Sequence, residues 1–412
     1  MRIFIWHGYL LHGTGSNEYT RALARTLARQ GHDVTVFCQD PDTLDVDLGG
    51  AHVVRPELPG RLPVFVLDRY PDLEPALLGD FRREELDAFV AANARAMRDH
   101  GPADLLIANH VLMGAPVAAA SGLPSLVKAH GSELEYVMRG NRALCQWAAQ
   151  SLQECLGVVA GSEHIKGVVM DLVGTRADRI TVIPPGVDTD EMRPLPRDEA
   201  LAGLLAEARA DVPGGERLPD PGNAERFARF LAADTHPRVV YVGKLSQEKG
   251  VPLLVDVLTE LGYPAVVVGF GPERAAAQAA AGDHILFTGP LQHRHLRHLW
   301  PLMDVSVVPS VFPEAFGMVA AEAAACGCPP LVADHSGLAE VAAGLRAYYP
   351  ARLRDLITFP SGDAGALAAA LHRYADLDAQ QRADLSGAAR TAAVDLWSWD
   401  TVARHVIEAA GL

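Results

Sequence analysis

Long apolar runs are absent from this sequence of 412 residues. No segment reaches the roughly 18 consecutive apolar residues that a helix needs to span a membrane. The first six residues are mostly apolar and run directly into polar residues and glycine, without the cleavage site of a leader peptide. They are typical of a buried strand. We therefore expect a cytoplasmic protein that does not associate with membranes.

Cysteine is also scarce. The chain has five cysteines, an odd number scattered along its length, and such a set does not make a disulfide framework. Cys326 and Cys328 form a C-x-C pair, but no further Cys or His stands at the spacing of a zinc site. The sequence therefore predicts neither a metal site nor a resident cofactor.

Positive charge is the third shortage. The chain has 36 lysines and arginines against 51 acidic residues, a formal net charge of -15. Binding to a nucleic-acid backbone requires clustered basic residues, and the negative charge also disfavours docking on anionic lipids. Three arginines between Arg21 and Arg29 fit the solvated face of a helix. Neither a nucleic acid nor a lipid surface is an expected partner.

The first half of the chain alternates short β-branched runs with helical stretches. This alternation is typical of parallel βαβ units, and the chain length suits two domains of about 200 residues each. The pattern predicts a Rossmann-like domain over residues 1–190. Its expected strands are Arg2–Trp6, Asp33–Cys38, Asp104–Ala108, Ser125–Ala129, Gly157–Ala160 and Ile180–Ile183.

The second half repeats the alternation and predicts another domain of the same class over residues 237–396. Its expected strands are Arg238–Val242, Ala265–Val268, His284–Phe287, Val305–Val308 and Pro330–Ala333. Residues 191–236 are rich in Pro, Gly, Asp and Ala, so we expect a linker or insertion with surface helices. The predicted fold class is α/β, with two facing, doubly wound parallel sheets. Because ligands bind beyond the carboxyl ends of such strands, the facing edges would form an interdomain cleft.

Two glutamates flank the start of a predicted helix after Val305–Val308. Glu314 lies in the turn and Glu322 lies two helical turns further, roughly 12 Å along the axis. A carboxylate accepts through two oxygens, so Glu314 suits sugar hydroxyls and Glu322 suits both hydroxyls of a ribose. Glu322 stands among residues that look buried, so it needs a partner. The helix amino terminus suits a diphosphate, and the residues expected to contact it are Ala315, Phe316, Gly317, Met318 and Val319.

Another polar turn follows the expected strand Arg238–Val242. It contains Lys244 and Lys249, five residues apart. Two lysines in such a turn can converge on phosphate oxygens and stabilise a departing diphosphate.

A glycine loop precedes the first predicted helix, which we expect from about Tyr19 to Gln30. Gly13 and Gly15 are followed by Glu18, where the G-x-G-x-x-G dinucleotide loop requires a small residue. A nicotinamide cofactor is therefore disfavoured. A loop whose N–H groups approach a phosphate fits this pattern.

Histidines follow two strands of the first half. His130, with Glu133 close behind it, comes after Ser125–Ala129, and His110 comes after Asp104–Ala108. The carboxyl ends of parallel strands share one edge of a sheet. We therefore expect His110, His130 and Glu133 at the ligand-binding edge of the first domain.

Together these motifs resemble those of the family-4 retaining glycosyltransferases, which have the two-domain GT-B fold. The resemblance covers nearly the whole chain. It places the final helix, residues 397–412, back on the amino-terminal domain. Its further elements are Gly31-His32-Asp33-Val34, His130-Gly131-Ser132-Glu133, Ile183-Pro184-Pro185-Gly186-Val187-Asp188, Gly243 to Gly250, Ser336-Gly337-Leu338-Ala339-Glu340 and Trp397-Ser398-Trp399-Asp400.

The resemblance implies transfer of a hexose-type sugar from a nucleoside-diphosphate sugar, with retention of configuration and without a metal. Lys244, Lys249 and the loop at Gly13 and Gly15 would hold the diphosphate. Family members commonly have Arg where Lys244 stands. This chain therefore has a single ammonium group in place of a guanidinium group that can donate two parallel hydrogen bonds. A donor phosphate oxygen would take the acceptor's proton. The catalytic set is then Lys244, Lys249, Glu314 and His130, with His130 orienting the sugar.

The acceptor would be bound by residues 58–80 together with His110, His130 and Glu133. Negative charge and the missing anchor favour a small soluble acceptor. Enrichment in Ala, Arg, Gly and Pro hints at a GC-rich bacterial genome and fits glycosylation of a natural product or of a small thiol. Uracil is the expected base by family precedent, whereas guanine, thymine and a homodimer stay open.

Three other interpretations compete with this one. The D-x-D triplets at 40–42, 45–47 and 188–190 would suit a metal-dependent transferase of the other major fold, but acidic residues are abundant here. A nucleotide-sugar epimerase of the same overall fold is disfavoured by two glutamates at this spacing. A sugar-nucleotide-binding protein without turnover is disfavoured because both lysines, His130 and both glutamates are intact.

Overall fold

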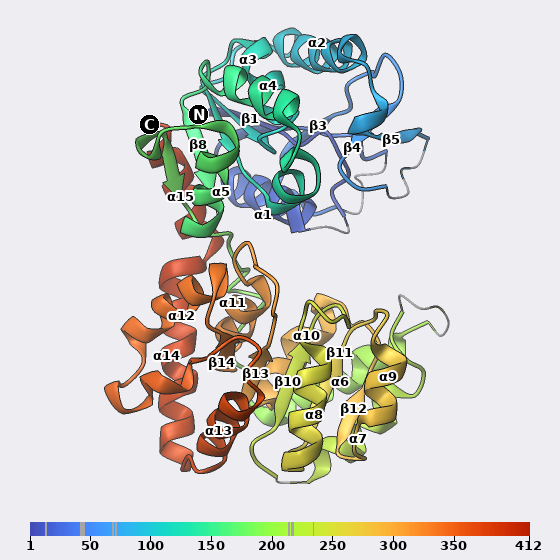
Figure 1. Ribbon diagram of the computed structural model, residues 1–412, viewed down its shortest axis with the longest axis vertical. Helices are drawn as coiled ribbons and strands as arrows, with labels where there is room; N and C mark the ends of the chain where they lie inside the picture. Colours follow the sequence, from blue (N-terminus) through green and yellow to red (C-terminus); the bar gives the residue numbers. More distant parts are fainter. Residues whose placement is uncertain are drawn as a thin grey trace. The chain divides into compact units, whose positions relative to one another are not determined.

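The computed structural model describes residues 1–12, 15–41, 46–67, 70, 72–212, 215, 218–233 and 235–412. The chain forms two compact units (Figure 1). Unit 1 comprises Met1–Gly186 and Trp399–Leu412, and unit 2 comprises Val187–Ser398. Within the described residues, no helix has the length and apolar character of a membrane span.

Unit 1 contains a parallel sheet of seven strands in the order β3-β2-β1-β6-β7-β8-β9. The order runs outward from β1 in both directions, as in a doubly wound fold. The strands are β1 (Arg2–Trp6), β2 (Asp33–Phe37), β3 (His52–Val54), β6 (Leu105–Asn109), β7 (Ser125–Lys128), β8 (Gly157–Ala160) and β9 (Ile180–Val182). A separate parallel pair is formed by β4 (Leu62–Val64) and β5 (Pro75–Leu77).

Helices cover both faces of this sheet, as the alternation of buried side chains in the strands requires. Ile3 and Ile5 pack with helices α1 and α15, whereas Phe4 and Trp6 pack with helices α2 to α5. The helices are α1 (Gly15–Arg29), α2 (Arg83–Asp99), α3 (Gly114–Ser121), α4 (Arg142–Leu152), α5 (Glu163–Val173) and α15 (Trp399–Ala409). The carboxyl-terminal helix is thus part of the core of unit 1.

Unit 2 contains a second parallel sheet, in the order β12-β11-β10-β13-β14-β15. Its strands are β10 (Val239–Val242), β11 (Ala265–Val268), β12 (Ile285–Phe287), β13 (Val305–Val308), β14 (Pro330–Ala333) and β15 (Thr358–Phe359). Its sheet is flanked by α8 (Val251–Leu261), α9 (Arg274–Ala280), α10 (His293–Leu299), α11 (Met318–Ala325), α12 (Ser336–Tyr348), α13 (Ala364–Ala375) and α14 (Ala379–Trp397). Both units therefore have the predicted α/β class with doubly wound parallel sheets.

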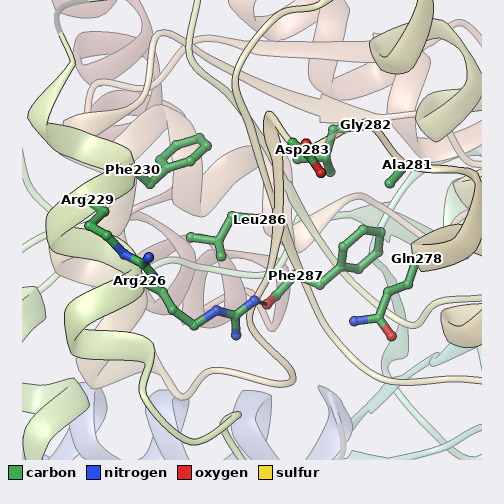
Figure 2. Close-up of a pocket in the computed structure, with 10 residues that line it drawn as sticks. Arg226, Arg229, Phe230, Gln278, Ala281, Gly282, Asp283, Leu286 and Phe287 are labelled. Carbon is green, nitrogen blue, oxygen red and sulfur yellow. Dashed lines mark hydrogen bonds between the residues drawn. The ribbon is translucent and has the colours of Figure 1, made fainter.

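Residues 191–236, expected as a linker, contain α6 (Arg197–Ala210) and α7 (Asn223–Ala232). Leu204 of α6 and Phe227 of α7 are fully buried in the core of unit 2. Arg226 donates to the carbonyl oxygen of Phe287 on the edge strand β12 at 2.6 Å. A cavity of about 540 Å³ is bordered by α7, the end of α9 and β12 (Figure 2). This segment therefore extends the packing of unit 2.

Each sheet has one point at which the strand order reverses. It lies between β1 and β6 in unit 1, and between β10 and β13 in unit 2. The helices that follow two such strands turn to opposite faces, which opens a crevice at the carboxyl ends of the strands. The turns after these four strands are therefore the places to look for ligand contacts.

Candidate functional site

The turns after β10 and β13 contact each other at the strand reversal of unit 2. The N–H group of Val311 donates to the carbonyl oxygen of Glu248 at 2.9 Å. Gly250 has a φ of +69°, and a Cβ atom there would collide with the carbonyl oxygen of Pro309. Only glycine lets the two turns approach this closely.

This approach brings Lys249 and Glu314 together. The Nζ atom of Lys249 lies 2.5 Å from Oε1 of Glu314, although 65 residues separate them in the sequence. Lys244 lies exposed in the same β10 turn, where its carbonyl oxygen accepts a hydrogen bond from the Tyr241 hydroxyl at 2.8 Å. Both lysines were predicted to lie near a diphosphate, whereas the Lys249–Glu314 ion pair was not predicted.

The turn after β14 supports Glu314 from a second direction. The main-chain N–H of Glu314 donates to the Ser336 hydroxyl at 2.9 Å, and its carbonyl oxygen accepts from the N–H of Gly337 at 3.1 Å. His335 donates from Nε2 to the carbonyl oxygen of Ser310 at 2.6 Å. Sequence reasoning assigned no role to His335 or Ser336, although their place at a strand end was a usable signal.

Glu322 has the partner that its surroundings required. Its side chain is 12% exposed, and Oε1 lies 3.2 Å from Nε2 of His293, which is 52% exposed. His293 is the first residue of α10. A partner for Glu322 was predicted, but its identity was not, because nothing in the local sequence pattern links the two helices.

The residues between the two glutamates occupy different environments. Ala315 is exposed, and Met318 and Val319 open α11 half-buried. Phe316 was expected to contact the ligand through its main chain, and its ring is buried and packs edge-to-face on Trp397 with centroids 5.8 Å apart. Gly317 has a φ of +127°, and a Cβ atom there would contact Leu338. Phe316 is thus left with only its main chain for contacts with a ligand.

Three histidines gather at the strand reversal of unit 1. His7 follows β1 and His110 follows β6, and their rings are stacked with centroids 5.8 Å apart. His130 follows β7 and lies 4.6 Å from His110 by the same measure. His110 and His130 were predicted from the sequence. His7 was not singled out, although its polar character at the end of the first strand was a signal.

Glu133 is fully buried and holds the turns that carry His110 and His130. Its Oε1 atom accepts from the N–H of His130 at 2.8 Å and from the N–H of Val111 at 3.3 Å. Its Oε2 atom lies 3.3 Å from Nδ1 of His110, a residue with a φ of +71° that is unusual for a side chain with a Cβ atom. Glu133 therefore contacts the protein directly, and it reaches a ligand only through its neighbours.

His130 is a neutral imidazole of defined tautomer. Its Nε2 atom lies 2.8 Å from Oδ1 of Asn109, whose Nδ2 atom donates to the carbonyl oxygen of Trp6 and to the Thr20 hydroxyl. Asn109 Oδ1 is thus an acceptor, so Nε2 of His130 carries the proton. Burial, with contributions from His110 and Lys128, lowers the pKa of His130 well below its usual value. Its Nδ1 atom is left as a hydrogen-bond acceptor.

Lys128 is buried close to His130. It is 3% exposed, its Nζ atom donates to the carbonyl oxygen of Ile183 at 3.3 Å, and it lies 5.0 Å from the centroid of the Tyr19 ring. Burial lowers its pKa to about 7, against an opposing effect of Glu133. A cation is therefore costly at this position.

The glycine loop is only partly described. Gly13 lies outside the described residues, and Gly15 is the first residue of α1, which begins earlier than the expected Tyr19. A Cβ atom at Gly15 would meet nothing within 4 Å, so no close approach within the protein requires this glycine. Of the loop at 58–80, residues 68, 69 and 71 lie outside the described part.

The D-x-D triplets are also partly outside the description, at 42 and 45. In the third, Oδ1 of Asp188 accepts from the N–H of Asp190 at 3.2 Å and of Glu191 at 3.0 Å, which closes a local turn. Among the residues that the structure describes, no three His, Cys, Asp or Glu side chains are grouped to hold a metal ion.

Comparison with known families decides the identity of the chain. The sequence profile of Glycosyltransferase Family 4 matches residues 13–191, and that of Glycosyl transferases group 1 matches residues 236–376. The chain belongs to the family-4 glycosyltransferases. The resemblance inferred from its motifs is thereby confirmed, and so is its class as a glycosyltransferase.

This family-4 glycosyltransferase has named relatives. It is 28% identical over 361 residues to the D-inositol 3-phosphate glycosyltransferase of Xylanimonas cellulosilytica, covering 79% of this chain and 77% of the relative. The protein of the same name from Acidothermus cellulolyticus is 29% identical over 357 residues, covering 79% of this chain and 71% of that protein. In fold it resembles Anabaena HepE in complex with UDP-glucose, with a TM-score of 0.67, 18% identity, and 99% and 98% of the two chains covered. The predicted GT-B fold is confirmed.

Proposed function

We propose that this glycosyltransferase moves a hexose-type sugar from a nucleoside-diphosphate sugar, most of all a UDP-sugar, to a hydroxyl of a small soluble acceptor, with retention of configuration. One observation carries the proposal: Lys249 and Glu314 meet at the strand reversal of unit 2. Glu322 lies on the helix that begins in the same turn.

The ion pair of Lys249 and Glu314 is suited to exchange with a donor. A diphosphate offers oxygens to Lys249, while the hydroxyls of the sugar offer hydrogens to Glu314. Both side chains therefore find new partners when their mutual contact opens, and neither charge is left unpaired. Lys244, exposed in the same turn, adds a second cation for the diphosphate.

The remaining donor contacts follow from position. Glu322 would accept both hydroxyls of the ribose, and the start of α11 would receive the diphosphate. Uracil is supported by the resemblance in fold to HepE, which was solved with UDP-glucose. We further propose that Lys244 and Lys249 supply the positive charge that a metal ion supplies in other transferases.

Transfer with retention needs no side-chain nucleophile. The acceptor oxygen attacks the anomeric carbon on the face from which the diphosphate leaves. One bond from that carbon to the phosphate oxygen breaks, one bond to the acceptor oxygen forms, and the acceptor proton passes to the released phosphate. His130 holds its own proton on Nε2 towards Asn109 and offers Nδ1 to a hydroxyl. We therefore propose that His130 orients this hydroxyl.

The acceptor would bind at the histidine cluster of unit 1. His130 is the partly exposed ring and offers Nδ1 to a hydroxyl group, while the buried rings of His110 and His7 pack next to it in turn. Burial lowers the pKa of both His7 and His130. Relatives of this chain are named for a phosphorylated inositol. We therefore propose an acceptor with several hydroxyls, of which a polyol is the first to test and a natural product the second.

The donor site can be tested by calorimetry. UDP, GDP and dTDP are titrated into the parent chain and into Glu322→Ala and Lys249→Ala. Loss of a hydrogen bond to a charged group should weaken binding by about tenfold or more. Glu260→Ala and Arg373→Ala, at exposed positions of unit 2, are matched controls. If both site variants bind like the parent, the donor-site assignment fails.

The reaction itself is tested by release of the nucleoside diphosphate. UDP-glucose is incubated with and without inositol, inositol phosphate and a panel of hydroxylated natural products. Acceptor-dependent release of UDP supports transfer. Epimerised donor without release would identify the rival enzyme class, and binding without either product would identify a protein without turnover.

A further inference from the structure

The contact between His293 and Glu322 is not used by the donor chemistry described so far. A carboxylate only accepts hydrogen bonds, so Nε2 of His293, 3.2 Å from Oε1, must carry the hydrogen. Glu322 is 12% exposed, and the alanines on both sides of it are fully buried. Among the residues that the structure describes, His293 is the donor that contacts this carboxylate, so it can set the orientation of the carboxylate.

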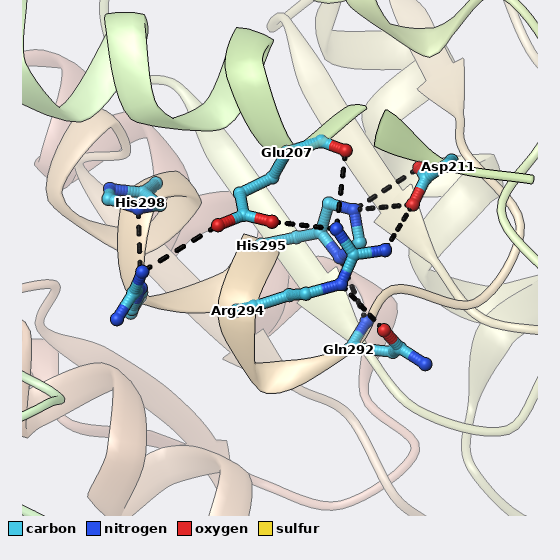
Figure 3. Close-up of polar contacts among 7 residues, drawn as sticks. Glu207, Asp211, Gln292, Arg294, His295 and His298 are labelled. Atoms are coloured by element: carbon cyan, nitrogen blue, oxygen red, sulfur yellow. Dashed lines mark hydrogen bonds and ion pairs between the residues drawn. The ribbon is translucent and has the colours of Figure 1, made fainter. Parts of the chain in front are cut away.

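The position of His293 is fixed by the residues that follow it in α10. Arg294 contacts Glu207 at 2.6 Å and Asp211 at 2.5 Å (Figure 3). His295 is fully buried, and its Nε2 atom lies 3.0 Å from Oδ1 of Asp211. Both acidic partners belong to α6 or its end. The segment 191–236 thus holds the start of α10 in place and His293 with it.

We propose that His293 is a positioning residue for the ribose of the donor. By donating to one oxygen of Glu322, it presents the other oxygen to the ribose hydroxyls and makes the site selective for ribonucleotides over 2′-deoxyribonucleotides. The inference rests on the proposed function, in which Glu322 binds the ribose. It adds a residue and a selectivity that the donor site alone does not require.

The test compares matched ribo and deoxy nucleotides. Affinities for UDP and 2′-deoxy-UDP, and for the GDP and ADP pairs, are measured by calorimetry on the parent, His293→Ala and His293→Gln. We expect the parent to prefer the ribonucleotide of the pair it binds. His293→Ala should reduce that preference by about tenfold, the value of one hydrogen bond to a charged group. His293→Gln should restore it, because the Gln amide nitrogen reaches close to the position of Nε2.

Controls separate a positioning role from a structural one. His372→Ala removes an exposed histidine of unit 2 that contacts the Tyr263 hydroxyl at 2.8 Å, and it should leave the ribo preference unchanged. If His293→Ala weakens ribo and deoxy nucleotides equally, or if the Gln variant fails to restore the preference while folding normally, the role of His293 is overturned.

Glu322→Gln distinguishes this inference from the proposed function. A reduced preference in Glu322→Gln together with a normal one in His293→Ala overturns only the inference. An unchanged preference in Glu322→Gln removes Glu322 from the ribose, which overturns both. Failure of the parent to bind any of the three pairs also overturns both.

Discussion

At the scale of single residues, burial determines the chemistry of the histidine cluster in unit 1. It lowers the pKa of His7 to about 3 and that of Lys128 to about 7. His130 is likewise held neutral. His7 and His130 are therefore neutral at pH 7, where Lys128 holds a proton in about half of the molecules, and Nδ1 of His130 offers a directed hydrogen bond. That combination suits the hydroxyl groups of an acceptor better than its phosphate, which needs basic side chains.

Because Lys128 is buried, we predict that the free energy of unfolding of unit 1 rises with pH. Its pKa is about 7 in the folded chain against an ordinary value of 10.5. Between these values only the unfolded chain holds the proton, so the free energy of unfolding should increase by about 1 kcal/mol per pH unit. Below pH 7 both states are protonated and this dependence vanishes.

Lys128→Met is the variant that isolates this effect. It should be more stable than the parent at pH 7.5, and the difference should shrink towards pH 9.5, because the proton that Lys128 releases on folding costs less to remove as the pH rises. Urea denaturation of both chains across this range measures the slope. Lys166→Met, at a partly exposed position of α5, is the control. Parallel slopes for Lys128→Met and the parent would contradict the prediction.

At the scale of elements, α6 and α10 are joined by a partly buried polar network. Arg294 and His295 of α10 both contact Asp211, which is only 8% exposed. Gly203 of α6 faces the ring of His298, where a Cβ atom would collide. Two helices that are distant in the sequence are thus fixed in register by charge and by shape.

Asp211→Ala should be strongly destabilising. It leaves Arg294 without one of its two carboxylates and the fully buried His295 without the carboxylate that its Nε2 atom contacts, at a cost of about 3 kcal/mol. Thermal denaturation should show a lower midpoint, and UDP binding should weaken because His293 precedes these residues. Asp256→Ala, at an exposed position of α8, should change neither. A normal midpoint in Asp211→Ala would contradict the network's role.

The sequence predicted most strands, because a buried parallel strand is a short apolar run that needs no distant information. Five expected strands, among them Arg2–Trp6 and Val305–Val308, have the predicted bounds. The strands His52–Val54 and Thr358–Phe359 were missed, since runs of three and two residues carry no periodic signal. The docking of residues 191–236 was also missed, because a helix face does not reveal what it packs against.

For the candidate site, the sequence predicted several of the residues but not their partners. Strand-end turns can be recognised locally, which is how Lys249, Glu314 and His130 were selected. Their partners depend on strand order and helix placement. The Lys249–Glu314 pair joins residues 65 apart, and His293 lies 29 residues from Glu322. No local pattern contains such distances.

At the scale of the whole molecule, the chain leaves unit 1 at Gly186 and returns to it at Trp399. Val187 and Ser398, the residues just inside unit 2, form a parallel bridge. In unit 1 the Trp399 ring packs on Tyr19 with centroids 5.3 Å apart, and a Cβ atom at Gly186 would collide with that ring. Trp399 therefore anchors the returning helix where the chain first leaves.

Trp399→Ala tests whether the two units carry separate parts of the reaction. Removal of this buried ring should destabilise unit 1 by about 3 kcal/mol or more. The donor contacts proposed for Lys249, Glu314 and Glu322 all lie in unit 2, so UDP affinity should stay within about twofold. Calorimetric unfolding with UDP at 100 times its Kd should stabilise unit 2 by about 2.7 kcal/mol in both the parent and the variant. Loss of UDP binding in a variant whose unit 2 still unfolds cooperatively would show that unit 1 contributes to the donor site, and the division of roles would have to be redrawn.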